Sequence, residues 1–221
     1  MKALVIAPHA DDEAFGMGGT IAKLVSRGHD VHSVVVTCGE GFGFNHLNGE
    51  AVSRDVRLKE LEAVSKLFGS THEMLRFTEE SKMDTLPIRD IVGEIESVHD
   101  RLKPDRWYVA GPSVHQDHRV VFEAAMTAAR ISRRNTPKEV YLYELPMYVM
   151  NHEPWVFKPN AWEDISDFLD TKIRSTYLYK SQVRENGPLS PSSLKNWAIA
   201  CGSECGIRAA ERFQIIRSVR D

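Results

Sequence analysis

The chain has 221 residues, of which 42% are hydrophobic, so it is long enough to bury one substantial core and we expect one domain. Its 28 basic and 31 acidic side chains leave a formal net charge of -3 and no basic stretch to contact phosphate backbones, which argues against a nucleic-acid partner. No apolar stretch approaches the ~20 residues of a membrane span, and the first residues lack the pattern of a signal peptide, so we expect a cytoplasmic protein without a membrane span.

The first two thirds of the chain alternate between strand-like and helix-like patterns. Short apolar or β-branched runs of strand length occupy residues 3–7, 31–37, 73–77, 107–110 and 140–144. Amphipathic patterns of helical period lie between them, at residues 20–27, 54–68, 86–102 and 120–131. Parallel strands need helical crossovers that bury both faces of the sheet. We therefore predict an α/β fold with a Rossmann-like, doubly wound, mostly parallel sheet and helices on both faces.

The last third of the chain has a different character. It is rich in proline and tryptophan and retains two helical patterns, at residues 168–182 and 193–213. We predict a single domain over residues 1–221, in which residues 146–221 form a C-terminal cap on a core of residues 1–145.

A histidine and three acids follow the first predicted strand directly, in the stretch Pro8-His9-Ala10-Asp11-Asp12-Glu13. Adjacent carboxylates repel one another and lose hydration when they are buried, so a bound cation is the expected compensation. His9 and Asp12 are three residues apart in a post-strand turn, a spacing that lets both side chains reach one metal ion. Glu13 either orients these ligands or is an acid favoured by the dipole of the following helix.

A second cluster, His115-Gln116-Asp117-His118, follows the predicted strand at residues 107–110. Ligands in such sheets bind at the carboxyl ends of the strands, so the two clusters meet if their strands are neighbours. Two histidines and one carboxylate then form a three-ligand site with an open position, which is typical of catalytic zinc. Zinc lowers the pKa of its bound water from 15.7 to about 7, which generates a nucleophile at neutral pH.

The remaining polar residues of the two clusters suit the chemistry of such a site. Asp11 is placed to take a proton from the water, and His115 to donate to a developing oxyanion or a leaving amine. We predict that Asp117 fixes the tautomer of His115.

The two clusters also resemble the signatures of one family. Pro8-His9-Ala10-Asp11-Asp12-Glu13 looks like the P-H-P-D-D-E signature of the LmbE-like or PIG-L zinc-dependent de-N-acetylases, and His115-Gln116-Asp117-His118 resembles their H-P-D-H signature. Further similar positions extend the resemblance over nearly the whole chain: Arg57, Glu60, Ala63, Asp164-Ile165-Ser166, Lys172, Ser181-Gln182, Gly202, Gly206, Ala210, Glu211 and Phe213.

The resemblance implies a function and a set of roles. The expected reaction removes an N-acetyl group from an N-acetylglucosamine-type amino sugar or its conjugate and releases acetate. The implied metal ligands are His9, Asp12 and His118, with Zn2+ as the cofactor and Fe2+ as the alternative metal in the cell. The implied catalytic residues are Asp11 as general base, His115 as the acid or electrophile and Asp117 as its orienter. Arg57 is the implied substrate-binding arginine. The resemblance does not decide between a monomer and a homo-oligomer.

This chain departs from the family pattern at three positions. Ala10 and Gln116 replace two prolines beside the ligands, and Ser113 stands where many members have Asp. The change at Ser113 affects any substrate or proton contact made at that position. We also consider the loop with Phe42 and Phe44, which follows the second predicted strand, as a lid over the site.

Two alternative functions fit parts of the same pattern. Two histidines and a carboxylate also suit a non-haem Fe(II) oxygenase, although the strand-helix alternation argues against that class. A catalytically inactive sugar-binding protein on the same scaffold is the other alternative, because a fold does not determine a function. Asp11 beside the ligands favours catalysis.

Overall fold

The computed structural model describes residues 1–40, 52–79, 81–133, 135–146, 156–183, 185–187 and 189–219. Its elements in chain order are β1 (Lys2–Ala7), α1 (Asp12–Ser26), β2 (Asp30–Glu40), α2 (Arg54–Phe68), β3 (Thr71–Glu79), η1 (Met83–Thr85), α3 (Ile88–Leu102), β4 (Arg106–Ala110), α4 (Gln116–Ala128), β5 (Glu139–Tyr143), β6 (Ala161–Asp164), α5 (Leu169–Leu178), α6 (Pro191–Ser203) and β7 (Ala210–Ser218).

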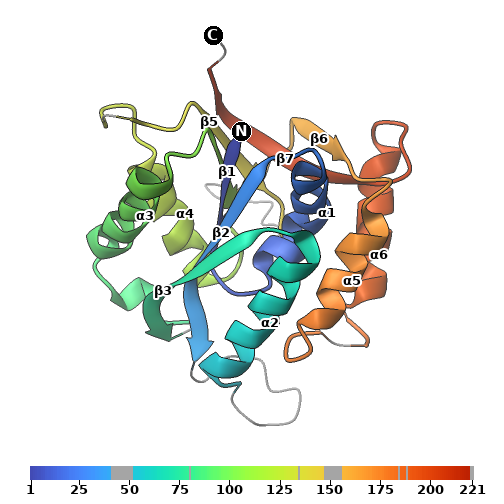
Figure 1. The fold of residues 1–221 in the computed structure, drawn as a ribbon, viewed down its shortest axis with the longest axis horizontal. Helices are drawn as coiled ribbons and strands as arrows, with labels where there is room; N and C mark the ends of the chain where they lie inside the picture. Colours follow the sequence, from blue (N-terminus) through green and yellow to red (C-terminus); the bar gives the residue numbers. More distant parts are fainter. Residues whose placement is uncertain are drawn as a thin grey trace.

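Seven of these strands form one sheet in the order β3-β2-β1-β4-β5-β7-β6. The first five run parallel, whereas β7 pairs antiparallel with β5 and β6 antiparallel with β7. In Figure 1, α3 and α4 cover one face of the sheet, and α1, α2, α5 and α6 cover the other. The predicted α/β doubly wound fold is confirmed. The strand order reverses between β1 and β4, so the carboxyl ends of these two strands are the expected ligand site.

The core consists of two apolar layers, one on each face of the sheet. Along β1, Val5 and Ala7 pack into the layer beneath α1, whereas Leu4 and Ile6 pack into the layer beneath α3 and α4. Successive side chains of a strand point to opposite faces, so a continuous apolar run serves both layers. Within the described residues, no helix is both long and apolar enough to cross a membrane.

Two helices begin earlier than the sequence pattern predicts. The sequence pattern predicts a first helix that starts at Thr20, but α1 starts at Asp12 and runs through Gly16, Gly18 and Gly19. The glycines are weak helix formers that pack closely here, because a Cβ on Gly16 would lie 2.4 Å from Tyr143 Cδ2. The fourth helix likewise starts at Gln116, not Val120. Both histidine-acid clusters therefore extend into the first turns of helices.

The C-terminal third differs most from the prediction. The helix expected over residues 193–213 is correct only for α6, and the chain after it forms the unpredicted strand β7. The short strand β6 was also not predicted. Phe213 of β7 is buried in the core layer beneath α1, so residues after 145 complete the sheet as well as cover it. The proposed lid residues Phe42 and Phe44 lie outside the described residues.

Candidate metal and catalytic centre

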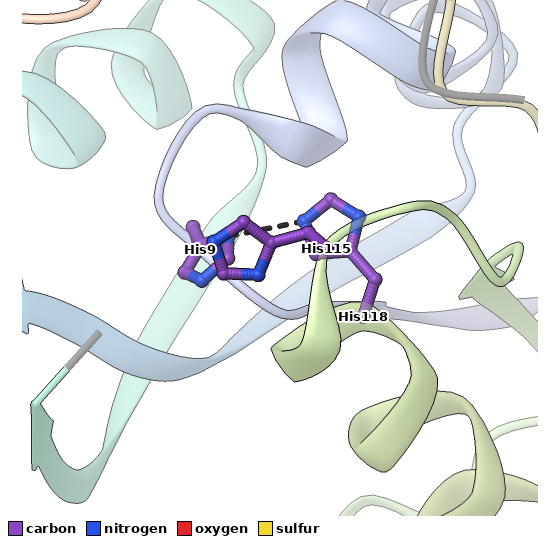
Figure 2. A group of neighbouring side chains, drawn as sticks. All are labelled: His9, His115 and His118. Atoms are coloured by element: carbon purple, nitrogen blue, oxygen red, sulfur yellow. Dashed lines mark hydrogen bonds between the residues drawn. The ribbon is translucent and has the colours of Figure 1, made fainter. Parts of the chain in front are cut away.

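The two histidine-acid clusters meet at one edge of the sheet because their strands are neighbours. β1 pairs in parallel with β4, with Ile6 opposite Val109, and each strand leads directly into one cluster. Figure 2 shows the rings of His9, His115 and His118 gathered at one point, His9 from the loop after β1 and the other two from the start of α4. Residues more than 100 positions apart thus share one site.

Three donor atoms of this site form a compact triangle. His9 Nδ1 lies 3.1 Å from His118 Nε2, and Asp12 Oδ2 lies 3.4 Å from each of these nitrogens. All three side chains are buried. Ligand atoms about 2.1 Å from a tetrahedral zinc ion lie about 3.4 Å apart, so the triangle fits one such ion. These donors are two imidazole nitrogens and one carboxylate oxygen, a common zinc ligand set.

Protonation states in the centre also suit a cation. Burial lowers the pKa of His118 to about 3, against the opposing charge of Asp12, so its ring is neutral at physiological pH. Burial acts to raise the pKa of Asp12, but His118 and hydrogen bonds from His9 outweigh it and hold that pKa below its ordinary value. A neutral imidazole and an ionised carboxylate are the forms that bind metals.

Asp117 is fully buried, and its carboxylate contacts His9. Oδ2 accepts hydrogen bonds from His9 Nε2 at 3.0 Å and from the Ser81 backbone N–H at 2.6 Å, and Oδ1 accepts from the Met83 N–H at 3.1 Å. The same carboxylate lies 4.0 Å from His115 Nδ1, so its side-chain hydrogen bond is to His9 and not to His115, the partner that the sequence predicts. The bond to His9 Nε2 leaves His9 Nδ1 as the ligand atom.

His115 lies beside the donor triangle with a different set of contacts. Its ring caps α4, because Nδ1 accepts the Asp117 backbone N–H at 3.2 Å. Its Nε2 lies 3.4 Å from Ser81 Oγ. An accepting Nδ1 places the proton of the neutral ring on Nε2, so His115 presents a hydrogen-bond donor at that end.

Asp11 is held in a strained conformation at the start of α1. Its φ of 151° lies in a region that residues other than glycine rarely adopt. Its backbone N–H donates to Glu13 Oε2 at 3.2 Å. Burial raises the pKa of the Asp11 carboxyl well above its ordinary value, although the Arg57 guanidinium opposes the shift. Asp11 is therefore a stronger base than an exposed aspartate.

Arg57 of α2 approaches Asp11 from the other side. Its Nη1 lies 3.7 Å from Asp11 Oδ2, and its side chain is only 1% exposed. Within the described residues, Arg57 Nε and Nη1 have no hydrogen-bond partner. Buried donors without partners are unfavourable, so this guanidinium is suited to meet an oxygen atom of a ligand.

Several contacts of the centre could not be inferred from the sequence. The backbone amides of Ser81 and Met83, around η1, hold Asp117, and no motif marks them. The Tyr179 hydroxyl donates a hydrogen bond to Glu13, whose other carboxylate oxygen accepts the Asp11 backbone N–H. Ser181 donates to Glu60 through both its backbone N–H and its hydroxyl, and both residues lie at positions of the family resemblance. That resemblance is the one sequence signal for the last pair.

Comparison with known proteins identifies a matching family and proteins of similar sequence. Residues 4–129 match the family model PIG-L, described as GlcNAc-PI de-N-acetylase. Diacetylchitobiose deacetylase of Thermococcus kodakarensis is 27% identical over 237 residues, which cover 99% of this chain and 84% of that protein.

Two solved structures show the same fold. N,N'-diacetylchitobiose deacetylase from Pyrococcus horikoshii has a TM-score of 0.77 and 24% identity, over 97% of this chain and 83% of that one. GalB, the 4-carboxy-2-hydroxymuconate hydratase of Pseudomonas putida, has a TM-score of 0.76 and 19% identity, over 100% and 98%. The fold thus carries more than one chemistry, so the function rests on the family and the site.

Proposed function

The chain belongs to the PIG-L family, and we propose that it is a metal-dependent deacetylase of N-acetylglucosamine-type substrates, with zinc as its metal bound by His9, Asp12 and His118. The observation that carries this proposal is the donor triangle, with edges of 3.1, 3.4 and 3.4 Å. Fe2+ is the competing metal for the same donors. His9, Asp12 and His118 would hold the zinc ion, which when bound would lower the pKa of a coordinated water and polarise the amide carbonyl of the substrate.

Asp11 acts as the general base in this proposal. Its buried carboxylate lies within the first cluster and takes a proton from the attacking water, and its raised pKa strengthens it as a base. The nearby Arg57 guanidinium favours the ionised carboxylate, which is the form that accepts a proton. Attack of the resulting hydroxide on the amide carbon gives a tetrahedral species, whose collapse breaks the C–N bond and releases acetate and the free amine.

His115 stabilises the charge that develops during this attack. Its Nε2 carries the proton of the neutral ring because Nδ1 accepts the Asp117 N–H, so Nε2 can donate to the oxyanion. Asp11 or His115 then protonates the leaving amine. Asp117 is a positioning residue for His9 in this scheme, since its carboxylate bonds to His9 Nε2.

Arg57 binds the sugar part of the substrate. Within the part of the chain that the structure describes, its buried Nε and Nη1 atoms have no hydrogen-bond partner, and Nη1 lies 3.7 Å from Asp11 Oδ2, so both atoms are suited to contact a ligand oxygen close to the reacting amide. A hydroxyl or a carboxylate of the sugar conjugate would satisfy them.

The test is zinc-dependent release of acetate. The protein is stripped of metal, reloaded with one equivalent of zinc or Fe2+, and incubated with a panel of N-acetylglucosamine conjugates. We expect zinc to restore acetate release, and Asp11→Asn to lower kcat by about 10²- to 10⁴-fold because it removes the base. The exposed Asp170→Asn variant is the matched control and should act like the wild type.

Each alternative function has a distinct signature in the same experiment. Oxygen consumption by the Fe2+-loaded protein without acetate release would indicate an oxygenase. Sugar binding without acetate release would indicate a binding protein. Wild-type turnover by Asp11→Asn would contradict the proposed mechanism.

A further inference from the structure

The Ser113 hydroxyl is a buried group that takes no part in the proposed reaction. Ser113 lies in the loop between β4 and α4 and is only 1% exposed. Its Oγ lies 2.7 Å from His118 Nδ1, the ring nitrogen that faces away from the donor triangle. The same Oγ accepts the backbone N–H of His115 at 3.1 Å. One hydroxyl therefore contacts both histidines of the second cluster.

We propose that Ser113 is the positioning residue that sets the tautomer and orientation of the metal ligand His118. The inference rests on the proposed metal site. A serine oxygen has two acceptor lone pairs; the His115 N–H fills one, and in the proposed tautomer the His118 Nδ1–H fills the other. With its proton on Nδ1, the neutral His118 ring presents the lone pair of Nε2 to His9 Nδ1 and Asp12 Oδ2. The opposite tautomer would carry its proton on Nε2 and could not bind a metal there.

The loop that carries Ser113 is fixed at both ends. Arg119 Nη1 donates to the carbonyl oxygen of Ser113 at 3.1 Å and to that of Val114 at 2.6 Å. The Gly111 N–H donates to the Tyr143 carbonyl oxygen at 2.9 Å. These hydrogen bonds fix the backbone around Ser113. Its hydroxyl is therefore already in position to orient the His118 imidazole.

A neutral acceptor suits this position on electrostatic grounds. The side chains of Asp11, Asp12 and Asp117 already place three carboxyl groups in the buried centre. A further carboxylate next to His118 would add another desolvated negative charge. The two ligand histidines are therefore oriented by different groups, His9 by the Asp117 carboxylate and His118 by the Ser113 hydroxyl.

The experiment measures zinc affinity directly, apart from turnover. The zinc dissociation constant is obtained by competition with a chromophoric chelator for the wild type, Ser113→Ala and Ser113→Thr. We expect Ser113→Ala to weaken zinc binding by roughly 10- to 100-fold, and Ser113→Thr to recover most of the loss because it restores the hydroxyl. Ser175→Ala is the matched control: it also removes a buried hydroxyl, bonded to the Lys172 carbonyl oxygen, and should leave zinc affinity unchanged.

A second measurement on the wild type keeps the inference falsifiable if Ser113→Ala does not fold. The nitrogen chemical shifts of His118 in the metal-free protein should show the proton on Nδ1. A proton on Nε2, or wild-type zinc affinity in folded Ser113→Ala, overturns the inference. Neither result affects the deacetylase function, whose failure would instead appear as absent acetate release by the zinc-loaded wild type.

Discussion

At the scale of single residues, Glu13 supports the catalytic turn from inside the protein. Its Oε2 accepts the Asp11 N–H at 3.2 Å, and its Oε1 accepts the hydroxyl of Tyr179, which follows α5. The sequence left Glu13 as either an orienter of ligands or a helix-dipole acid. In the structure Glu13 lies in the first turn of α1 and bonds to the backbone of Asp11, which is not one of the proposed metal ligands. Burial raises the pKa of Glu13 from 4.5 to about 7.

This raised pKa predicts a pH dependence of stability that Glu13→Gln removes. The folded metal-free protein holds the Glu13 proton up to about pH 7, whereas the unfolded chain releases it near 4.5. The contribution of protonated Glu13 to stability is thus fully present below pH 4.5 and is lost as the pH rises to about 7. The free energy of unfolding of Glu13→Gln, relative to the wild type, should rise by about 3 kcal/mol across this range.

Urea unfolding of both proteins at several pH values measures this difference. Subtracting the free energy of unfolding of the wild type removes the contributions of other titrating groups. One of them is His118, whose lowered pKa makes stability rise with pH. Glu62→Gln, at an exposed position of α2, is the control. A difference that stays constant with pH would show that Glu13 does not titrate in this way.

At the scale of elements, α1 is two helical segments joined at a break, and a buried ion pair spans that break. Met17 has non-helical angles, φ -140° and ψ 25°. Lys172 Nζ donates to the Phe15 carbonyl oxygen at 2.7 Å, and Glu211 accepts the backbone N–H groups of Gly19 and Thr20 at 3.0 and 2.7 Å. The cation thus caps the end of the first segment, and the anion caps the start of the second.

The two side chains of this ion pair lie 2.6 Å apart and are both buried, which predicts a strong response to mutation. Lys172→Met should destabilise the protein by about 3–5 kcal/mol, because it leaves the Glu211 charge buried without its partner. The double variant Lys172→Met/Glu211→Gln should recover part of this loss, since a neutral amide oxygen still accepts from the α1 backbone. Chemical denaturation measures both values.

A surface ion pair provides the comparison for the Lys172 and Glu211 variants. Arg130 and Glu96 also form a short ion pair, but the Arg130 side chain is 45% exposed, so Arg130→Met should cost at most about 1 kcal/mol. Equal effects of Arg130→Met and Lys172→Met, or a double variant less stable than Lys172→Met alone, would contradict the proposed role of the buried pair.

At the scale of the whole molecule, the C-terminal third is required to complete the sheet. β7 pairs with β5 and carries Glu211, which caps the second segment of α1. α5 and α6 cover the same face of the sheet as α1 (Figure 1). We therefore propose that residues 1–145 and 146–221 fold as one unit.

A truncated chain of residues 1–145 tests this proposal. It would leave β5 as an exposed edge and would expose the apolar layer beneath α1, so we expect no cooperative thermal transition and no dispersed NMR spectrum. The full-length protein should unfold in one transition. A folded, cooperative fragment would show that the first 145 residues are a domain of their own.

The sequence by itself determined the class of the fold and the residues of the candidate centre. Continuous apolar strands alternating with amphipathic helices indicate a parallel sheet, and the polar clusters at Pro8–Glu13 and His115–His118 mark two strand ends. These patterns are local in the sequence. The spacing of residues within one turn determines which side chains of a cluster can reach the same metal ion. The roles of the individual residues remain predictions for the experiments above.

The tertiary structure alone decided which groups meet across the chain. The pairing of β1 with β4 brings the two clusters together, and the loop around η1 turns Asp117 toward His9. The strand β7 also escaped prediction, because its pairing partner β5 lies about 70 residues earlier. Hydrogen bonds and packing between distant segments depend on the whole topology, and no local pattern of residue types encodes them.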